Sequence, residues 1–272
     1  MPDTTRFRTI DDVVQGFDAL EVRFRAAGDR RAIFVTLYGT VSTEIRARLA
    51  QRFFSDNEWV ARYAVTFGNL YLDALDDYEA HRRDRVPKAW RLCFDLARSA
   101  EGLVVQDMLL GINAHVNHDL PFALEAISID PDRARRHGDH GAVNAVLASV
   151  VERATARIAE LYAPGLAPLD EIAGPLDELL GLFSLQVARD SAWESALALS
   201  NARNPIERRL ACSLIDSRAA IMARLLRAPA LSPATVSACR RLEGGPEWLG
   251  MVAGALGCNR IPDAVVDRRS GV

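Results

Sequence analysis

Residues 103–127 read LVVQDMLLGINAHVNHDLPFALEAI, and the fold class follows from this segment. Its large apolar residues recur three or four positions apart, which is the spacing that places side chains on one face of an α-helix. They are Val105, Met108, Leu109, Ile112, Val116 and Leu120. Because a strand is rarely this long, the segment predicts a long amphipathic helix that packs against other helices.

Helical spacing continues on both sides of this segment. The expected helices are Asp11–Ala27 after the N-cap candidate Thr9, Val41–Phe54, Trp59–Glu79, one opened by Pro87, Val143–Leu161, Leu176–Leu199, Ile206–Leu226 and a short one at Trp248–Leu256. Only Ala32–Tyr38 has the composition of a strand, and since one short strand cannot make a sheet, we expect helix there too. The sequence therefore predicts an all-α, single-domain multi-helix bundle over residues 1–260, followed by a polar tail over residues 261–272.

Composition narrows the classes of partner. The chain has 272 residues, with 33 basic and 36 acidic side chains and a net charge of −3, so nucleic acid is not expected as a partner. No apolar run approaches the roughly 20 residues that a membrane span needs. The first residues, MPDTTRFR, are polar and predict no secretory signal. The four cysteines form no CxxC pair, so we expect reduced thiols and a cytoplasmic protein.

Polar side chains interrupt the apolar face of the 103–127 helix. His115 and Asp119 are four residues apart, so they lie one turn apart at the rim of that face. Asn113 and Asn117 flank them, and His118 projects from another side. An unpaired buried charge costs several kcal/mol, so this pattern predicts either a polar cavity or a tight hydrogen-bonded network between helices. Pro121 removes a helix N–H and frees a carbonyl beside these residues.

Other expected helices carry polar groups on their apolar stripes. Gln186 and Asp190 lie on the stripe that includes Trp193, with Arg189 at its edge, and Arg218 lies on the stripe of Leu210, Leu214, Ile221 and Leu225. Asp73 and Asp77 flank the helix that also carries Tyr71. Asn144 begins the helix after the 128–141 connection, in which His137 and His140 are expected to be solvated. Inward polar groups from several helices are typical of a site in a bundle core.

Four stretches give the chain a resemblance to a known family: AIFVTLYGTVS (32–42), FFSDNEWVARYAVTFGNLYLDAL (53–75), VPKAWRLCFDLA (86–97) and LLGINAHVNHDLPFAL (109–124). Together they resemble the bacterial family called domain of unknown function 5995, from about Ile10 to Leu226. NAHVNHDL is the most specific part, followed by Asp139 with Asn144 and by Ala188, Arg189, Ala192 and Trp193. The resemblance implies an all-helical fold and supplies no reaction.

Three functions fit these residues. The first is an enzyme in which His115, Asp119 and Asn113 carry out acid–base chemistry without a cofactor, namely hydrolysis, elimination, isomerisation or cyclisation. Its substrate, a small and partly apolar metabolite, would be held by Arg189, Arg218, Asn117, Asn144, Trp193, Gln186, Asp190 and Tyr71. The second is a metal enzyme in which one divalent ion binds His115, Asp119 and His118, with Asp73 or Asp77 as further ligands. The third is a non-catalytic protein that binds a lipid or another small molecule. A homodimer is compatible with each.

Overall fold

The structure is a computed structural model, and it describes residues 6–164, 184–227 and 233–243. These residues form helices joined by turns and short connections, with no strand among them, which confirms the predicted all-α multi-helix fold. In chain order the elements are α1 (Ile10–Ala26), α2 (Ala32–Ala50), α3 (Asn57–Glu79), α4 (Lys88–Ser99), α5 (Val104–Asn113), η1 (Ala114–Asp119), α6 (Leu120–Ala126), α7 (Arg133–Tyr162), α9 (Leu185–Ser200), α10 (Pro205–Arg227) and α11 (Pro233–Glu243). The expected polar tail and the expected helix at Trp248–Leu256 lie outside the described residues.

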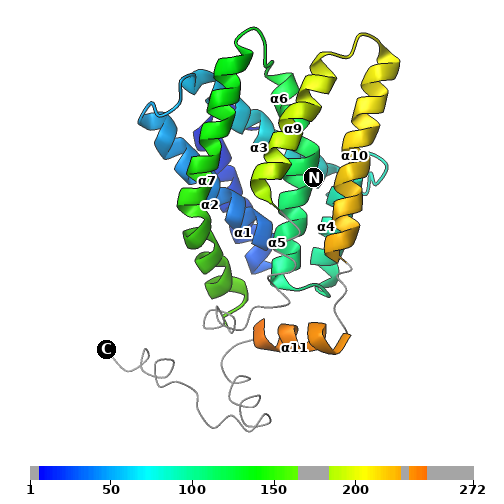
Figure 1. Cartoon of the computed structure of the whole chain (residues 1–272). Coiled ribbons are helices and arrows are strands. Elements are labelled where there is room, and N and C mark those ends of the chain that lie inside the picture. Colours follow the sequence, from blue (N-terminus) through cyan, green and yellow to red (C-terminus); the bar gives the residue numbers. More distant parts are fainter. Residues whose placement is uncertain (1–5, 165–183, 228–232, 244–272) are drawn as a thin grey trace.

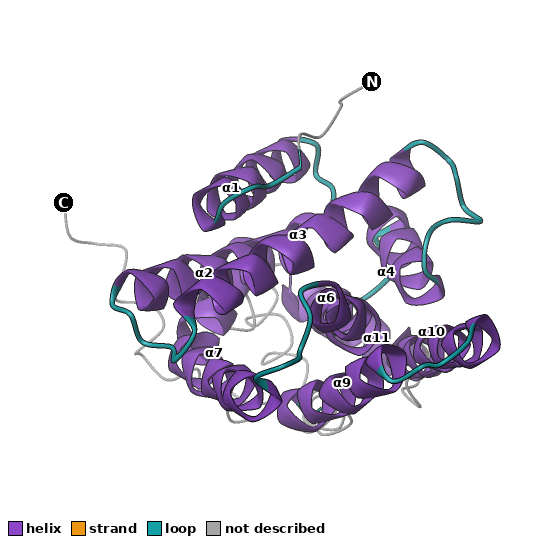
Figure 2. Cartoon of the chain, turned by 90° about the horizontal axis from the view of Figure 1, so that it is seen from above, coloured by secondary structure: helices purple, strands orange, loops and turns teal. Residues whose placement is uncertain are grey.

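The segment α5–η1–α6 is the central rod of the bundle. Viewed from above, α6 is surrounded by α3, α4, α7, α9 and α10 (Figure 2). Helix α1 packs on α2 and α3, α7 packs on α2, and α10 packs on α4 and α5. Helix α11 lies across one end of the bundle (Figure 1), where the Glu243 carboxylate accepts the Val104 N–H at 2.7 Å. No helix among the described residues has the length and apolar character that crossing a membrane requires.

The structure confirms the predicted N-cap of the first helix and changes both predicted ends of the second. Thr9 caps α1 as expected, since its hydroxyl accepts the Asp12 N–H and the Asp12 carboxylate accepts the Thr9 N–H. The strand-like residues 32–38 are helical and join the next expected helix to form α2. Helix α2 ends at Ala50 rather than at residue 54, because Arg52 adopts a positive φ of 53° that stops the helix.

The expected solvated connection at 128–141 is wrong for most of its length, because α7 begins at Arg133. Asp139 and His140 are both buried. The Asp139 carboxylate accepts the N–H groups of Ser55 and Asp56 at 2.8 and 2.7 Å, so it fastens the α2–α3 connection to α7. Two glycines and a run of charge indicated a loop here, but these contacts and the burial of His140 favour helix.

The predicted orientation of α10 is also wrong. Its large apolar side chains Leu210, Leu214, Ile221 and Leu225 face outward and are each more than half exposed. The buried face consists of the small side chains of Ala219, Ala220 and Ala223, with Ile215 and Leu226 at its two ends. Alanines allow α10 to approach α5 and η1 closely, and the Asn113 side-chain amide donates to the Ala219 carbonyl at 2.9 Å. Close helix packing therefore selects the small face rather than the most hydrophobic one.

Candidate functional site

The helix changes its winding where the candidate residues lie. In η1 the Leu120 N–H donates to the His115 carbonyl five residues back, which defines a π-turn. Pro121 follows immediately and has no N–H to donate, so the ordinary four-residue bonding pattern is interrupted at this point. Such π-turns inside α-helices are frequent at functional sites. Within this turn the side chains of His115 and Asp119 lie in contact and are both buried.

Asp119 is the hub of a buried hydrogen-bonded cluster. Its Oδ2 lies 3.0 Å from Nδ1 of His115 and accepts the indole N–H of Trp90 at 2.8 Å. Its Oδ1 lies 2.8 Å from Nδ1 of His118. His115 and Asp119 are each only 2% exposed. The sequence predicted the pairing of His115 with Asp119, and the structure adds Trp90 as a donor from α4.

The cluster fixes the protonation of both partners. Burial raises the pKa of Asp119, but the hydrogen bonds from His115 and His118 outweigh burial and leave this pKa below its usual value. Burial lowers the pKa of His115, and the hydrogen bond with Asp119 only partly opposes it. The pair is therefore a carboxylate beside a neutral imidazole that carries its proton on Nδ1.

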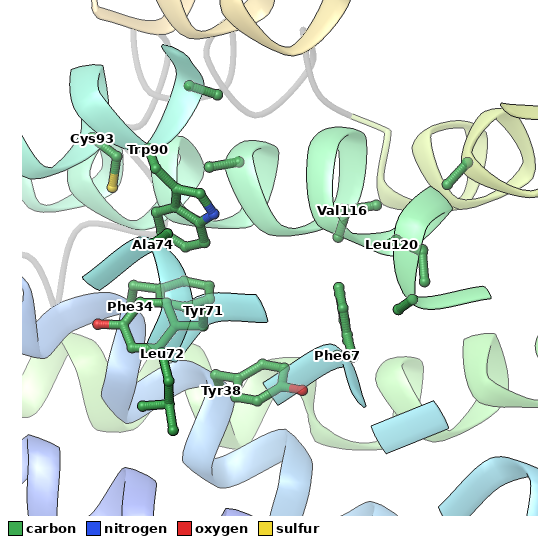
Figure 3. Packing of buried hydrophobic residues seen from close by; sticks show 14 of the residues in the cluster. Phe34, Tyr38, Phe67, Tyr71, Leu72, Ala74, Trp90, Cys93, Val116 and Leu120 are labelled. Atoms are coloured by element: carbon green, nitrogen blue, oxygen red, sulfur yellow. The ribbon is translucent and has the colours of Figure 1, made fainter. Parts of the chain in front are cut away.

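The other nitrogen of His115, Nε2, is buried and has no hydrogen-bond partner in the described part of the chain. Aromatic rings surround the imidazole. Phe67 stacks on it with ring centres 3.4 Å apart, and Tyr38 and Phe34 meet it edge-on at 4.6 and 5.5 Å. Figure 3 shows Phe34 below Trp90, Tyr38 lower in the core and Phe67 further along the central rod, below Val116. The unprotonated nitrogen thus faces an apolar, aromatic environment.

A second polar cluster lies next to Phe67, around Arg189. The Arg189 guanidinium donates to Asn144 Oδ1 at 2.6 Å, to the Tyr63 hydroxyl at 3.3 Å and to the His140 carbonyl at 2.7 Å. Arg189 is 3% exposed, and among the described residues no carboxylate lies within 4.0 Å of it. Tyr63 joins the two clusters, since its ring centre is 5.9 Å from that of Phe67.

His140 belongs to this second cluster although its burial was not predicted. Burial, and then the charge of Arg189, lower the pKa of His140 to about 2, so its imidazole is neutral. Trp193, one of the predicted binding residues, packs against it with ring centres 5.3 Å apart. The burial of His140 could have been predicted if the helix had been expected to begin at Arg133. His140 and Asn144 then lie one turn apart on the same face of that helix.

Several predicted site residues lie elsewhere. Gln186 and Asp190 are exposed on α9, and Arg218 is exposed on α10, where it donates to the Ser191 hydroxyl, so the expectation that these three point inward is wrong. Asn113 is fully buried, and besides its bond to α10 it accepts the Asn117 amide at 2.9 Å. Tyr71 is also fully buried but lines a different part of the core.

The residues of the metal alternative are arranged differently from a ligand set. Both His115 and His118 direct Nδ1 at Asp119. Asp73 pairs with Arg6, and Asp77 pairs with Arg82 at 2.6 Å. Within the described ranges, no three His, Cys, Asp or Glu side chains are grouped so that they could hold a metal ion.

The fold and the site together define a class: an all-α bundle whose central rod carries a buried histidine–aspartate pair at a π-turn. The chain belongs to the Family of unknown function (DUF5995), whose model matches residues 10–229. This confirms the family that the motif NAHVNHDL indicates. No curated protein matches the chain, and no solved structure matches it.

Proposed function

We propose that this protein is an enzyme in which His115 is the general base and Asp119 is its orienting carboxylate. The observation that carries the proposal is the buried Nε2 of His115, which has no partner in the described part of the chain while Nδ1 is held by Asp119. A neutral imidazole held in this tautomer presents a lone pair for proton abstraction. Trp90 and His118 hold the carboxylate from two other sides.

The chemistry follows from one proton transfer. Nε2 takes a proton from a substrate C–H or O–H group, or from a water molecule, and the resulting imidazolium is stabilised by the adjacent Asp119 carboxylate. The same nitrogen can then return the proton to the leaving group or to a neighbouring carbon. Hydrolysis, elimination, isomerisation and cyclisation all fit this sequence without a cofactor. The aromatic rings of Phe67, Tyr38 and Phe34 favour a substrate with an apolar part.

Arg189 favours a substrate that also carries an anionic group. A buried guanidinium without a nearby carboxylate is costly unless another charge balances it. Asn144, Tyr63 and the His140 carbonyl hold the guanidinium in place. A carboxylate or phosphate group on the substrate would balance the charge of Arg189. The substrate class we propose is therefore a small, partly apolar metabolite with one acidic group, acted on in the cytoplasm.

The test uses a metabolite extract. Purified wild-type protein and the His115→Gln variant are incubated with the extract, and mass spectrometry follows which metabolites are consumed and which appear. We expect the wild type to transform a metabolite that His115→Gln leaves unchanged. His81→Gln is the matched control, because His81 is exposed in the turn after α3, so this variant should retain activity.

Two outcomes would contradict the proposal. The first is equal transformation by the wild type and by a folded His115→Gln variant, which would remove the base from the mechanism. The second is an extract that the wild type leaves unchanged, while denaturing the purified protein releases a bound metabolite. That second result would support a non-catalytic binding protein.

A further inference from the structure

The outward face of α10 carries a stripe of large apolar side chains, each more than half exposed. Because successive helical residues turn by about 100°, these side chains fall within one arc of about 100°, opposite the alanines that face the bundle. The stripe extends for about 30 Å along the helix. A contiguous exposed apolar surface usually marks an interaction site. The apolar stripe consists of Ile206, Leu210, Leu214, Ile221 and Leu225.

Exposed arginines flank the apolar stripe on both sides. Arg209, Arg224 and Arg227 lie along one flank of the helix, and Arg218 lies along the other. Among the described residues, no carboxylate lies within 4.0 Å of any of these four guanidinium groups. The apolar stripe therefore has a positively charged rim.

The acidic residues of α10 leave an excess of positive charge on this rim. Asp216 pairs with Lys88 of α4 at 2.9 Å, and the Glu207 carboxylate accepts two hydrogen bonds from the turn that precedes α10. The α3–α4 connection, which reads RRDR at residues 82–85, lies on the same side of the bundle as α10 in both views (Figures 1 and 2). The charges around the apolar stripe therefore favour an anionic partner.

Shape and charge together distinguish the possible partners. A second copy of the chain would bring the same arginine rim against its own, and like charges across an interface are unfavourable. A groove that receives a partner helix encloses it, whereas α10 lies at an outer corner of the bundle, so the apolar stripe forms a ridge (Figure 2). An apolar ridge flanked by arginines is typical of helices that lie in the surface of an anionic bilayer.

We propose that the apolar stripe of α10 binds the surface of an anionic lipid bilayer. The helix lies in the plane of the membrane, and the five apolar side chains enter the boundary between headgroups and acyl chains. The flanking guanidinium groups bind lipid phosphates, for which the two parallel N–H groups of arginine are well suited. The aliphatic part of each arginine side chain lies along the apolar surface.

The test is co-sedimentation of the full chain with two kinds of vesicle. One contains equal parts of phosphatidylcholine and phosphatidylglycerol, and the other contains phosphatidylcholine alone. We expect the wild type to bind the anionic vesicles at least about tenfold more tightly, since each arginine near an anionic surface contributes to binding. Binding should weaken at 1 M salt, where charges are screened beyond about 3 Å.

Two variants and one control locate the contact on α10. Ile221→Glu puts a charge into the apolar stripe, and Arg224→Glu reverses a charge on its rim, so each should weaken binding to the anionic vesicles at least about tenfold. Val151→Glu is the matched control, because Val151 and Ile221 are both 55% exposed. Val151 belongs to α7, which α9 separates from α10 (Figure 2), so this variant should bind like the wild type. Circular dichroism verifies that each variant is folded.

Four outcomes would overturn the proposal. A folded wild type that stays in the supernatant with anionic vesicles does not bind them. Equal binding by the wild type and Ile221→Glu would place the contact outside the apolar stripe. A dimeric wild type that becomes monomeric in Ile221→Glu would assign the stripe to a second copy of the chain. An unfolded Ile221→Glu variant would mean that the stripe is covered by other parts of the same chain.

Discussion

Replacing His140 by glutamine tests the packing around Arg189 through the pH dependence of stability. In the folded protein the pKa of His140 falls to about 2, because of burial and then the charge of Arg189, whereas the ordinary value is 6.5. Below pH 6.5 the unfolded chain binds a proton at this position and the folded chain does not. Acid therefore favours unfolding, and the stability of the wild type relative to His140→Gln decreases as the pH is lowered.

The magnitude follows from linkage. Each pH unit below 6.5 costs the wild type about 1.4 kcal/mol through this one histidine, so its advantage over His140→Gln shrinks by about 2 kcal/mol between pH 6.5 and pH 5. The wild-type curve alone is not diagnostic. Burial raises the pKa values of Asp107 and Glu243 to about 6 and about 7, and these groups favour folding as the pH falls over the same range. Comparing the two proteins cancels that contribution.

The assay is urea unfolding at several pH values between 5 and 7, followed by circular dichroism. Asn144→Ala is the matched control, because it also removes a contact of Arg189 and introduces no titrating group. The loss of unfolding free energy caused by Asn144→Ala should be the same at every pH. The loss caused by His140→Gln should become smaller as the pH is lowered. Parallel curves for the wild type and His140→Gln would show that His140 gains its proton in the folded state, and the reasoning about its burial would be refuted.

Three further substitutions test the packing of the rod and of α10. Trp90→Phe removes a hydrogen bond to a carboxylate and should lower the free energy of unfolding in urea by about 1.5–3 kcal/mol. Trp59→Phe removes a hydrogen bond to a carbonyl and should lower it by less. Equal losses for the two variants would argue against a charged acceptor. Gly111→Ala places a methyl group 2.5 Å from a ring on α2 and should lower the free energy of unfolding by about 1–3 kcal/mol. Gly138→Ala places its methyl group in open space and should leave the free energy of unfolding unchanged or raise it. Leu214→Gln should change the unfolding free energy by less than about 0.5 kcal/mol, and a loss of several kcal/mol would place this side chain in the core.

The sequence predicts the helices well because their apolar spacing is local information. The pairing of His115 with Asp119 was predictable for the same reason, since two residues four apart on one helix meet whatever the rest of the fold does. The partners of that pair from other helices, such as the indole N–H of Trp90, depend on how the helices are arranged. The spacing of apolar residues within one helix does not predict how that helix packs against the others.

The errors in the prediction have related causes. For α10, spacing identifies an apolar stripe and an alanine-rich stripe, and only the neighbouring helices decide which one is buried. For α7, Gly138 and Gly141 lower the intrinsic preference for helix, but tertiary contacts of Asp139 and His140 outweigh it. In both cases the deciding contacts come from residues distant in the sequence.

The π-turn of η1 makes the histidine–aspartate pair sensitive to chain length. A turn closed over five residues contains one residue more than an α-helical turn. If a single residue between Gly111 and His115 were deleted, α6 would keep its place only if the π-turn became an ordinary α-helical turn. Otherwise the part of the rod before the deletion would be rotated by about 100° relative to the part after it. The segment around the π-turn should therefore tolerate substitutions far better than insertions or deletions. We expect its length to vary less among family members than its amino-acid composition does.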